Sequence, residues 1–195
     1  MKWYIGMDVG GTQIKAGIMD EKGTLHGEPC YYDACAKRSR EEILSNMFNI
    51  FKETVAHISD PDKKILGAGM AFPGDFDYEK GISLIRGIDK YEAVYKENIK
   101  QEIEDRIRKD AAFDGICEKG FEILFVHDIA AFLLGKIESG IPYAEDKIMA
   151  LCIGTGAGSS FAAGGRIIGE EVSGVPHKGW FYDTDFRCGI IDTYL

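Results

Sequence analysis

Short apolar runs, several of them alternating with polar residues, fill the first part of the chain and predict β-strands. Three such runs cover residues 3–9, 14–19 and 25–32. The segments between them, residues 10–13 and 20–24, are short and rich in turn-forming residues. Consecutive strands joined by tight turns predict a β-meander at the start of the fold.

A helical period replaces this pattern over residues 39–58, where apolar side chains recur every three or four positions. Ser39 and Glu42 at its start fit a capping box. Two further helical patterns cover residues 98–112 and 129–139. Apolar runs between and after the helices predict strands at residues 65–72, 122–126, 148–153 and 159–163. The order β-β-β-α-β-α-β-α-β-β predicts an α/β fold with a mixed sheet.

The composition is that of an ordinary globular protein, with 45% hydrophobic and 28% charged residues. The formal net charge is −9 and no basic run offsets it, so we expect no nucleic-acid partner. No signal-peptide pattern begins the chain and no apolar run is long enough to cross a membrane. The five cysteines are scattered and odd in number, so we expect reduced thiols and a cytoplasmic protein.

Two glycine-rich turns, each between two predicted strands, are candidates for binding phosphate. Glycine lets backbone N–H groups approach phosphate oxygens closely, and threonine hydroxyls add donors. One such hairpin alone is as readily an ordinary turn, because Asp and Gly form turns in any protein. A pair of them on either side of a Pro-Gly turn at residues 73–74 favours phosphate binding. The two turns are Gly10, Gly11 and Thr12, and Gly154, Thr155 and Gly156.

Two charged residues flank the first turn. Asp8 ends the strand before it, and we expect its carboxylate to hold Mg²⁺ through water, because Mg²⁺ keeps several waters in proteins. Lys15 lies in the strand after it, where it either neutralises a phosphate or is simply solvated. The turn leads into a strand and not into a helix, which excludes the Rossmann dinucleotide pattern.

Asp128 follows a predicted strand and precedes a predicted helix. A carboxylate there can accept the proton of a hydroxyl that attacks a γ-phosphoryl group. The same position is typical of a helix N-cap, which spacing alone favours slightly. His127 and His177 are candidates for substrate contacts, although a lone histidine is more often structural. Residues 180–182, W-F-Y, either stack on a sugar or belong to the core.

Five segments in order along the chain resemble motifs of the ROK family, named for repressors, open reading frames and sugar kinases. Residues 5–15 resemble its first phosphate motif, and residues 153–158 resemble its second. Residues 67–74 resemble the G-x-G-x-P-G segment beside the sugar. Residues 126–131 resemble V-x-N-D-A-N-A, whose aspartate is the catalytic base, and residues 164–169 resemble the N-G-K-x-x-x-G turn.

The resemblance implies an actin-like ATPase (ribonuclease H-like) fold of two lobes with mixed sheets. The first lobe would span residues 1–121 and the second would begin within residues 122–195. Family members continue with further helices, so we expect the second lobe to be incomplete and the sequence to be a fragment. The implied activity is transfer of the γ-phosphoryl group of ATP, with Mg²⁺, to a hydroxyl of a hexose or amino-sugar-like substrate. Because ROK kinases are often dimers, a homodimer is implied as well.

Roles for individual residues follow from the same resemblance. Asp128 would be the catalytic base, and this assignment outweighs the cap interpretation. Asp8 would orient Mg²⁺. The residues expected at the nucleotide are Asp8, Gly10, Gly11, Thr12, Lys15, Gly154, Thr155 and Gly156. Those expected at the substrate are Pro73, Gly74, His127, Asp128, His177 and Asp192.

The chain departs from the family pattern where the family binds sugar and zinc. His127 stands where the family has Asn, and residues 177–180 keep only the glycine of E-x-G-H. The cysteine-rich loop is reduced to Cys188, with Asp192 at the place of a sugar-binding Glu. A structural zinc site needs about four ligands, so we expect no zinc. Because the sugar-binding positions are altered, we also do not expect the substrate to be an unmodified hexose bound in the usual way.

Two other functions stay open. A non-catalytic sugar-sensing or regulatory ROK protein fits the altered sugar positions; no helix-turn-helix fits before Asp8, which disfavours a DNA-binding repressor. A general actin-like ATPase with a protein partner is the third, and the motif order around residues 73–74 and Asp128 counts against it.

Overall fold

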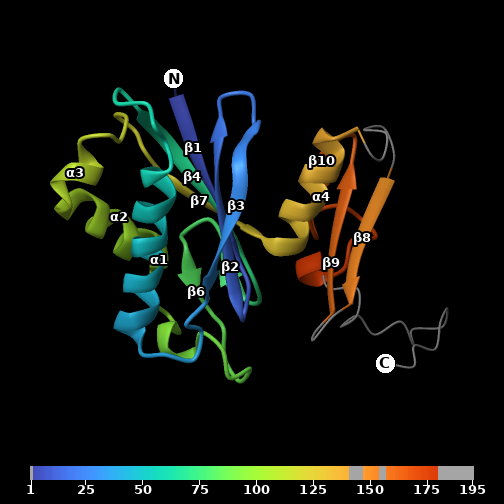
Figure 1. Cartoon of the computed structure of the whole chain (residues 1–195). Helices are drawn as coiled ribbons and strands as arrows, with labels where there is room; N and C mark the ends of the chain where they lie inside the picture. The colour runs from blue at the N-terminus through green and yellow to red at the C-terminus, as the bar shows by residue number, and fades with distance from the viewer. Residues whose placement is uncertain (1, 141–146, 154–156, 180–195) are drawn as a thin grey trace, which may run out of the picture. The chain divides into compact units, whose positions relative to one another are not determined.

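The computed structural model of the chain describes residues 2–140, 147–153 and 157–179 (Figure 1). The chain divides into two compact units, Met1–His127 and Asp128–Leu195. Strands and helices follow one another after an opening β-meander, and the first unit contains a mixed sheet. The predicted α/β fold with a mixed sheet is therefore confirmed.

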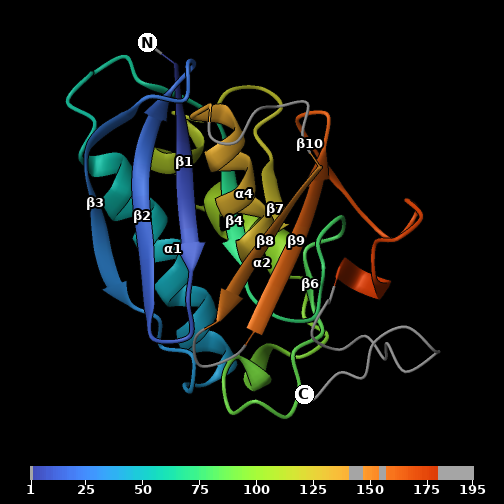
Figure 2. The same cartoon turned by 90° about the vertical axis from the view of Figure 1, so that its right-hand side faces the viewer.

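The larger unit is built on a five-stranded sheet with the order β3-β2-β1-β4-β7, seen side by side in Figure 2. Strand β1 pairs with β2 in antiparallel fashion and with β4 in parallel fashion, and β4 pairs in parallel with β7. The carboxyl ends of β1, β4 and β7 therefore lie along one edge of the sheet, together with the β1–β2 turn. The strands are β1 (Lys2–Val9), β2 (Gln13–Asp20), β3 (Leu25–Asp33), β4 (Lys64–Phe72) and β7 (Ile123–His127).

Alternating burial fixes which face of the sheet meets the core. In β1 every second side chain is buried, from Trp3 to Val9, as a period of two requires. Helix α1 (Arg40–Ala56) covers this face (Figure 1) and buries its own apolar stripe, which includes Met47 and Phe51. The predicted capping box is confirmed, because Ser39 accepts from the Glu42 N–H while the Glu42 carboxylate accepts from the Ser39 N–H.

One predicted helix is wrong in its extent. Residues 98–112 form two helices, α2 (Ile99–Lys109) and α3 (Ala111–Asp114), separated by Asp110. Asp110 takes the extended conformation (φ −92°, ψ 96°), and its carboxylate accepts a hydrogen bond from the Phe113 N–H. The carboxylate therefore caps the second helix, and the apolar period alone did not reveal this break.

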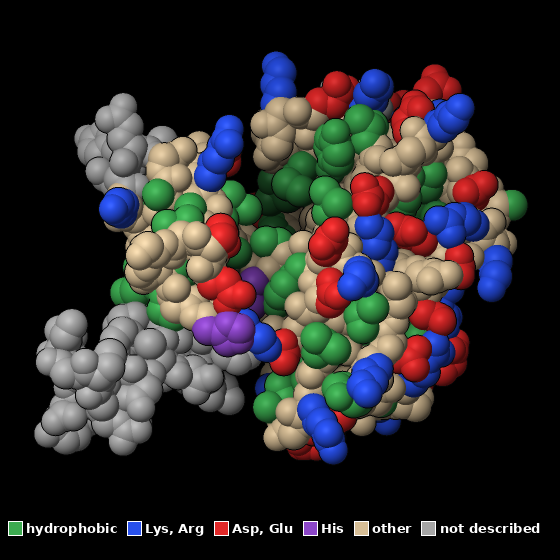
Figure 3. Space-filling model, turned by 180° about the vertical axis from the view of Figure 1, so that it is seen from behind, with side chains coloured by type: hydrophobic (Ala, Val, Ile, Leu, Met, Phe, Trp, Pro, Cys, Tyr) green, Lys and Arg blue, Asp and Glu red, His purple; other side chains and the backbone are tan. Residues whose placement is uncertain are grey.

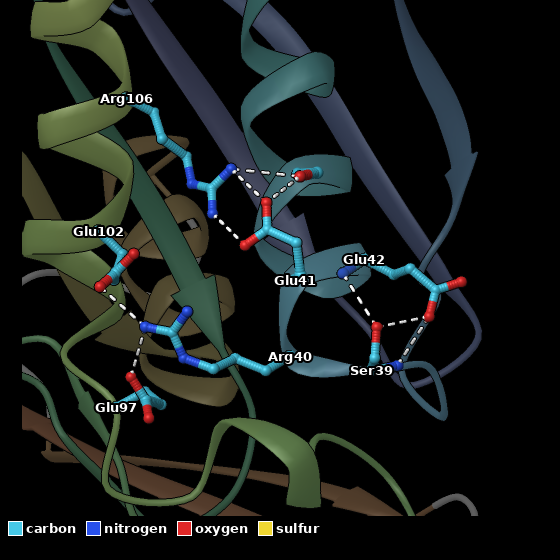
Figure 4. A network of polar contacts seen from close by, with 8 residues as sticks. Ser39, Arg40, Glu41, Glu42, Glu97, Glu102 and Arg106 are labelled. Atoms are coloured by element: carbon cyan, nitrogen blue, oxygen red, sulfur yellow. Dashed lines mark hydrogen bonds and ion pairs between the residues drawn. The ribbon is translucent and has the colours of Figure 1, made fainter.

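A network of ion pairs joins the start of α1 to α2 (Figure 4). Arg40 contacts Glu97, in the loop before α2, and Glu102, in its first turn, each at 2.8 Å. Arg106 of α2 makes two hydrogen bonds to the carboxylate of Glu41, at 3.0 and 2.8 Å. Single exposed pairs contribute little, but a bidentate arginine in a network holds two helices in register. Through Glu97, the network also holds the segment that follows Tyr91, and the Tyr91 hydroxyl bonds to the β1–β2 turn.

Three short elements of the larger unit were not predicted. They are β5 (Phe76–Asp77), β6 (Ile82–Ser83) and the 3-10 helix η1 (Glu92–Val94). The two strands pair in antiparallel fashion directly after the Pro-Gly turn. Two residues are too few to show a period, so the sequence pattern contains no signal for them.

The smaller unit contains an antiparallel sheet of order β10-β9-β8 with helix α4 packed on β8 and β9 (Figure 1). Strands at residues 148–153 and 159–163 were predicted, and β10 was not. Gly164 and Gly165 both have positive φ, 58° and 74°, and join β9 to β10 in a two-residue hairpin turn. The elements are α4 (Asp128–Glu138), β8 (Lys147–Ile153), β9 (Ala157–Ala163), β10 (Arg166–Ile168) and the 3-10 helix η2 (His177–Gly179).

The surface of the larger unit carries charges of both signs. On the face in Figure 3, Lys and Arg side chains lie among Asp and Glu side chains, and the described residues form no continuous basic patch there. Within the described ranges, no helix combines the length and the apolar character that a bilayer crossing needs.

Candidate functional site

The candidate site of the larger unit lies where β1, β4 and β7 end. Asp8 stands opposite Ala71 in the register of β1 and β4, and Phe72 stands opposite His127 in that of β4 and β7. Asp8, the Pro73-Gly74 turn and His127 therefore follow one another along the same edge. In open α/β sheets, ligands bind at the carboxyl ends of the parallel strands.

The β1–β2 turn is closed by its own backbone. The Gly10 N–H donates to the Gln13 carbonyl oxygen at 3.0 Å. A Cβ at Gly10 would lie 2.8 Å from that oxygen, so only glycine fits this position. Thr12 is exposed, and its carbonyl oxygen accepts from the Ala34 N–H at 3.0 Å. The turn is thus a backbone loop held by hydrogen bonds, with an exposed threonine.

Tyr91 braces this turn from a distant part of the chain. Its hydroxyl donates to the Gly10 carbonyl oxygen at 2.8 Å, across 81 positions of sequence. The Tyr91 N–H donates to the Ala36 carbonyl oxygen at 2.7 Å, which joins this loop to the segment after β3. The tyrosine is 1% exposed, and burial raises the pKa of its hydroxyl. No sequence motif marks this residue.

Asp8 and Lys15 form an ion pair with each other. Neither prediction for Lys15, phosphate neutralisation or simple solvation, included this pair. They are cross-strand partners in β1 and β2, and the Lys15 Nζ lies 3.0 Å from the Asp8 Oδ2. Both side chains are half exposed, and the hydrogen bond to Asp8 raises the pKa of Lys15. The Lys15 ammonium is thus engaged by a carboxylate of its own sheet.

The Pro73-Gly74 turn is held by Tyr78. The Tyr78 hydroxyl lies 3.0 Å from the carbonyl oxygens of both Phe72 and Gly74. Gly74 has a φ of +77°, which favours glycine, and the Tyr78 ring meets the His127 ring edge-on at 6.0 Å. His127 is half-buried beside an aromatic ring, so an imidazole and a phenol stand together at the end of β7.

Asp128 and His177 belong to the smaller unit. Asp128 is the first residue of α4, and its carboxylate accepts a hydrogen bond from the Ile129 N–H at 2.7 Å. A negative charge in the first turn is favourable for the helix dipole. His177 is exposed, and its Nδ1 lies 2.5 Å from the Glu170 carboxylate. The pKa of Glu170 is lowered, first by a hydrogen bond from the Lys178 N–H and then by His177.

Several predicted site residues lie outside the described residues. These are Gly154, Thr155 and Gly156 of the second glycine turn, Asp192, Cys188 and residues 180–182. The flanking strands β8 and β9 pair in antiparallel fashion up to Ile153 and Ala157.

Among the residues that the structure describes, no three or more His, Cys, Asp or Glu side chains are grouped closely enough to hold a metal ion. A single half-exposed carboxylate such as Asp8 nevertheless fits the way Mg²⁺ binds beside phosphates, through one or two carboxylates and retained waters. Asp8 is therefore the residue of this edge that would hold Mg²⁺.

A cavity of about 510 Å³ lies away from this edge, at the amino end of β7. Its lining includes Glu104, Arg108 and Cys117. Arg108 is already paired with Glu104 and Asp105, at 3.2 and 2.8 Å. These charges satisfy one another, and the carboxyl edge remains the stronger candidate.

A glycine turn between antiparallel strands, beside the carboxyl ends of two further parallel strands, is the arrangement expected of an actin-like ATPase fold, and solved sugar kinases share the fold of this chain. The chain belongs to the ROK family, whose model matches residues 4–181. It is 25% identical over 164 residues to a glucokinase of Thermotoga maritima, covering 84% of this chain and 45% of the relative.

Solved structures share the fold. A ROK family glucokinase from Streptomyces griseus in complex with glucose and AMPPNP is 23% identical, with a TM-score of 0.62, over 85% of this chain and 46% of that one. A ROK family transcriptional regulator, described as a homolog of the E. coli MLC protein, is 16% identical, with a TM-score of 0.65, over 87% and 38%. The chain thus spans less than half the length of these relatives.

Proposed function

We propose that the protein is an ATP-dependent sugar kinase that phosphorylates a hydroxyl of a hexose or amino-sugar-like substrate. The β1–β2 turn carries the proposal: its two glycines lie at the carboxyl edge of the sheet, and the turn is held by hydrogen bonds from the Tyr91 hydroxyl to Gly10 and from the Ala34 N–H to Thr12. Apart from the Gly10 N–H, which donates to Gln13, such a turn offers backbone N–H groups to phosphate oxygens. Glucokinases among the relatives support a sugar as the acceptor.

In the proposed reaction Asp128 accepts the proton of the substrate hydroxyl. The hydroxyl oxygen forms a bond to the γ-phosphorus, the bond from that phosphorus to the β–γ bridging oxygen breaks, and ADP leaves. Residues 10–12 would bind the phosphates in the larger unit, and residues 154–156 would contribute from the second turn. Mg²⁺, held through Asp8, would supply charge neutralisation at the phosphates.

The acceptor sugar would contact residues at several predicted positions. His127 stands beside Tyr78, and an imidazole there offers a donor or acceptor to a sugar hydroxyl where the family has an amide. The substrate-side residues in this proposal are Pro73, Gly74, His127, Asp128, His177 and Asp192.

The test is ATP-dependent phosphorylation of a panel of hexoses, amino sugars and N-acetylated sugars by the protein in its full natural length. Asp128→Asn should lower turnover about a hundredfold or more, as loss of a general base does, and leave ATP binding unchanged. Asp62→Asn, which removes an exposed carboxylate in a turn before β4, is the matched control and should keep full turnover. Unchanged turnover in Asp128→Asn would refute its role as the base.

A sugar-sensing regulator is the second candidate. Two observations favour it: His127 replaces the family's Asn, and a ROK transcriptional regulator shares the fold. A regulator would bind one sugar of the panel and release no ADP with any of them. The same panel, measured by binding and by turnover, therefore separates the two functions.

A further inference from the structure

Lys90 reaches the β1–β2 turn from the loop between β6 and η1. A Cβ at Gly11 would lie 2.5 Å from the Lys90 Cδ and 2.7 Å from its Nζ. The end of the Lys90 side chain thus rests directly against the Cα of Gly11, in space that only a glycine leaves open. The lysine is half-buried there.

The Lys90 ammonium differs from the other lysines around the turn. Lys15 is paired with Asp8 at 3.0 Å, and Lys37 is paired with Asp89. In the described part of the chain, no carboxylate forms an ion pair with Lys90. The neighbouring Asp89 carboxylate acts on the Lys90 ammonium only at longer range and is itself paired with Lys37, so the lysine on the tip of the turn has no direct ion-pair partner in the described part of the chain.

The position of Lys90 is fixed by its neighbour. Tyr91 is buried, its hydroxyl donates to the Gly10 carbonyl oxygen at 2.8 Å, and its N–H donates to Ala36 at 2.7 Å. Since Lys90 is the adjacent residue, its backbone is held against the same turn. The Lys90 side chain therefore extends from a backbone that is held beside the turn.

We propose that Lys90 binds the polyphosphate of a nucleoside triphosphate at the β1–β2 turn. The proposal rests on the proposed function, because it assumes that this turn is where the phosphates bind. Lys90 supplies a full positive charge beside the backbone N–H groups, which donate hydrogen bonds but carry only partial charges. Lys15, which lies within the motif itself, forms an ion pair with the Asp8 carboxylate instead.

Binding is the direct test, with the protein in its full natural length and with ATP, inorganic tripolyphosphate and AMP as probes in calorimetric titrations. Lys90→Met should weaken ATP and tripolyphosphate binding about tenfold, the order expected for one charge-assisted hydrogen bond, and leave AMP binding nearly unchanged. Lys90→Arg should restore most of the affinity. Lys22→Met, which removes an exposed charge from the β2–β3 turn, is the control for net charge.

The outcomes separate the two proposals. If Lys90→Met binds tripolyphosphate as tightly as the wild type, or loses AMP equally, Lys90 is not a phosphate ligand, whether or not the protein is a kinase. If tripolyphosphate binding depends on Lys90 while no sugar is phosphorylated, the role of Lys90 holds and the kinase proposal falls. A wild-type protein that binds neither ATP nor tripolyphosphate overturns both.

Discussion

Removing one hydroxyl, with Tyr91→Phe, tests whether the phosphate turn depends on a contact from outside its own motif. The Tyr91 hydroxyl donates to the Gly10 carbonyl oxygen at 2.8 Å, and the ring packs 5.2 Å from that of Phe72. Phenylalanine keeps the ring and its packing. The substitution therefore removes the hydrogen bond and leaves the Gly10 carbonyl without this partner.

The cost follows from the kind of bond lost. A hydrogen bond within a protein contributes about 1 kcal/mol net, and a buried acceptor left unsatisfied costs about 1–3 kcal/mol. For a chain of this size, 1 kcal/mol corresponds to a fall in the unfolding midpoint of about 2–4 °C. Because the turn is less well held, ATP binding should weaken by a few fold (about 2–5-fold), while sugar binding should not change.

The assay pairs thermal unfolding with ATP titration, and Tyr95→Phe is the matched control. Tyr95 loses the same hydroxyl at the other end of η1, but the residue is 37% exposed. The control should unfold and bind ATP as the wild type does. If Tyr91→Phe also matches the wild type in both measurements, the Gly10 turn is held by its own backbone, and the bracing argument is wrong.

Two further predictions concern titrating groups. The hydrogen bond from His26, with one from the Thr24 N–H, lowers the pKa of Asp20 from 3.8 to about 2. The ionised Asp20 carboxylate therefore stabilises the fold above pH 3.8, and this contribution is lost as the pH falls toward 2. Asp20→Asn should therefore lower the unfolding midpoint near pH 7 but not near pH 2; an equal loss at both pH values would contradict this. Burial raises the pKa of the Cys117 thiol from 9.0 to about 11, which leaves about a hundredfold less thiolate near pH 8. Iodoacetamide labelling followed by peptide mass spectrometry should find Cys117 reacting far more slowly than a free cysteine, and equal rates would contradict the burial.

Local patterns were enough to predict the elements that have a long period and a distinct end. Buried positions alternate with more exposed ones over all eight residues of β1 and over the first six of β2, and the Ser39 capping box marks the start of α1. The break at Asp110 was missed because a residue that ends one helix and caps the next does not interrupt the apolar period. The strands β5 and β6 were missed because two residues show no period at all.

The candidate site was predictable only where it is local in sequence. The turn at residues 10–12 is a contiguous motif, and its position at the carboxyl edge follows from strand order. Tyr91 and Lys90 reach the turn across about 80 positions, by a loop with no regular pattern. No rule based on spacing connects residues that far apart, so only the tertiary structure could bring them to the site.

The two lysines at the turn show how strand register decides which ammonium has an ion-pair partner. Lys15 is close to the glycines in sequence, which suggests phosphate neutralisation, but the antiparallel register places it opposite Asp8 and an ion pair results. Lys90 has no motif around it, yet its side chain lies on Gly11 with no ion-pair partner among the described residues. The missing side chain of Gly11 leaves room for the Lys90 ammonium, and under the proposed function it would also let phosphate approach the backbone N–H groups of the turn. A larger residue at position 11 would displace the Lys90 side chain and crowd the phosphate, so both features of the proposed site depend on this one glycine.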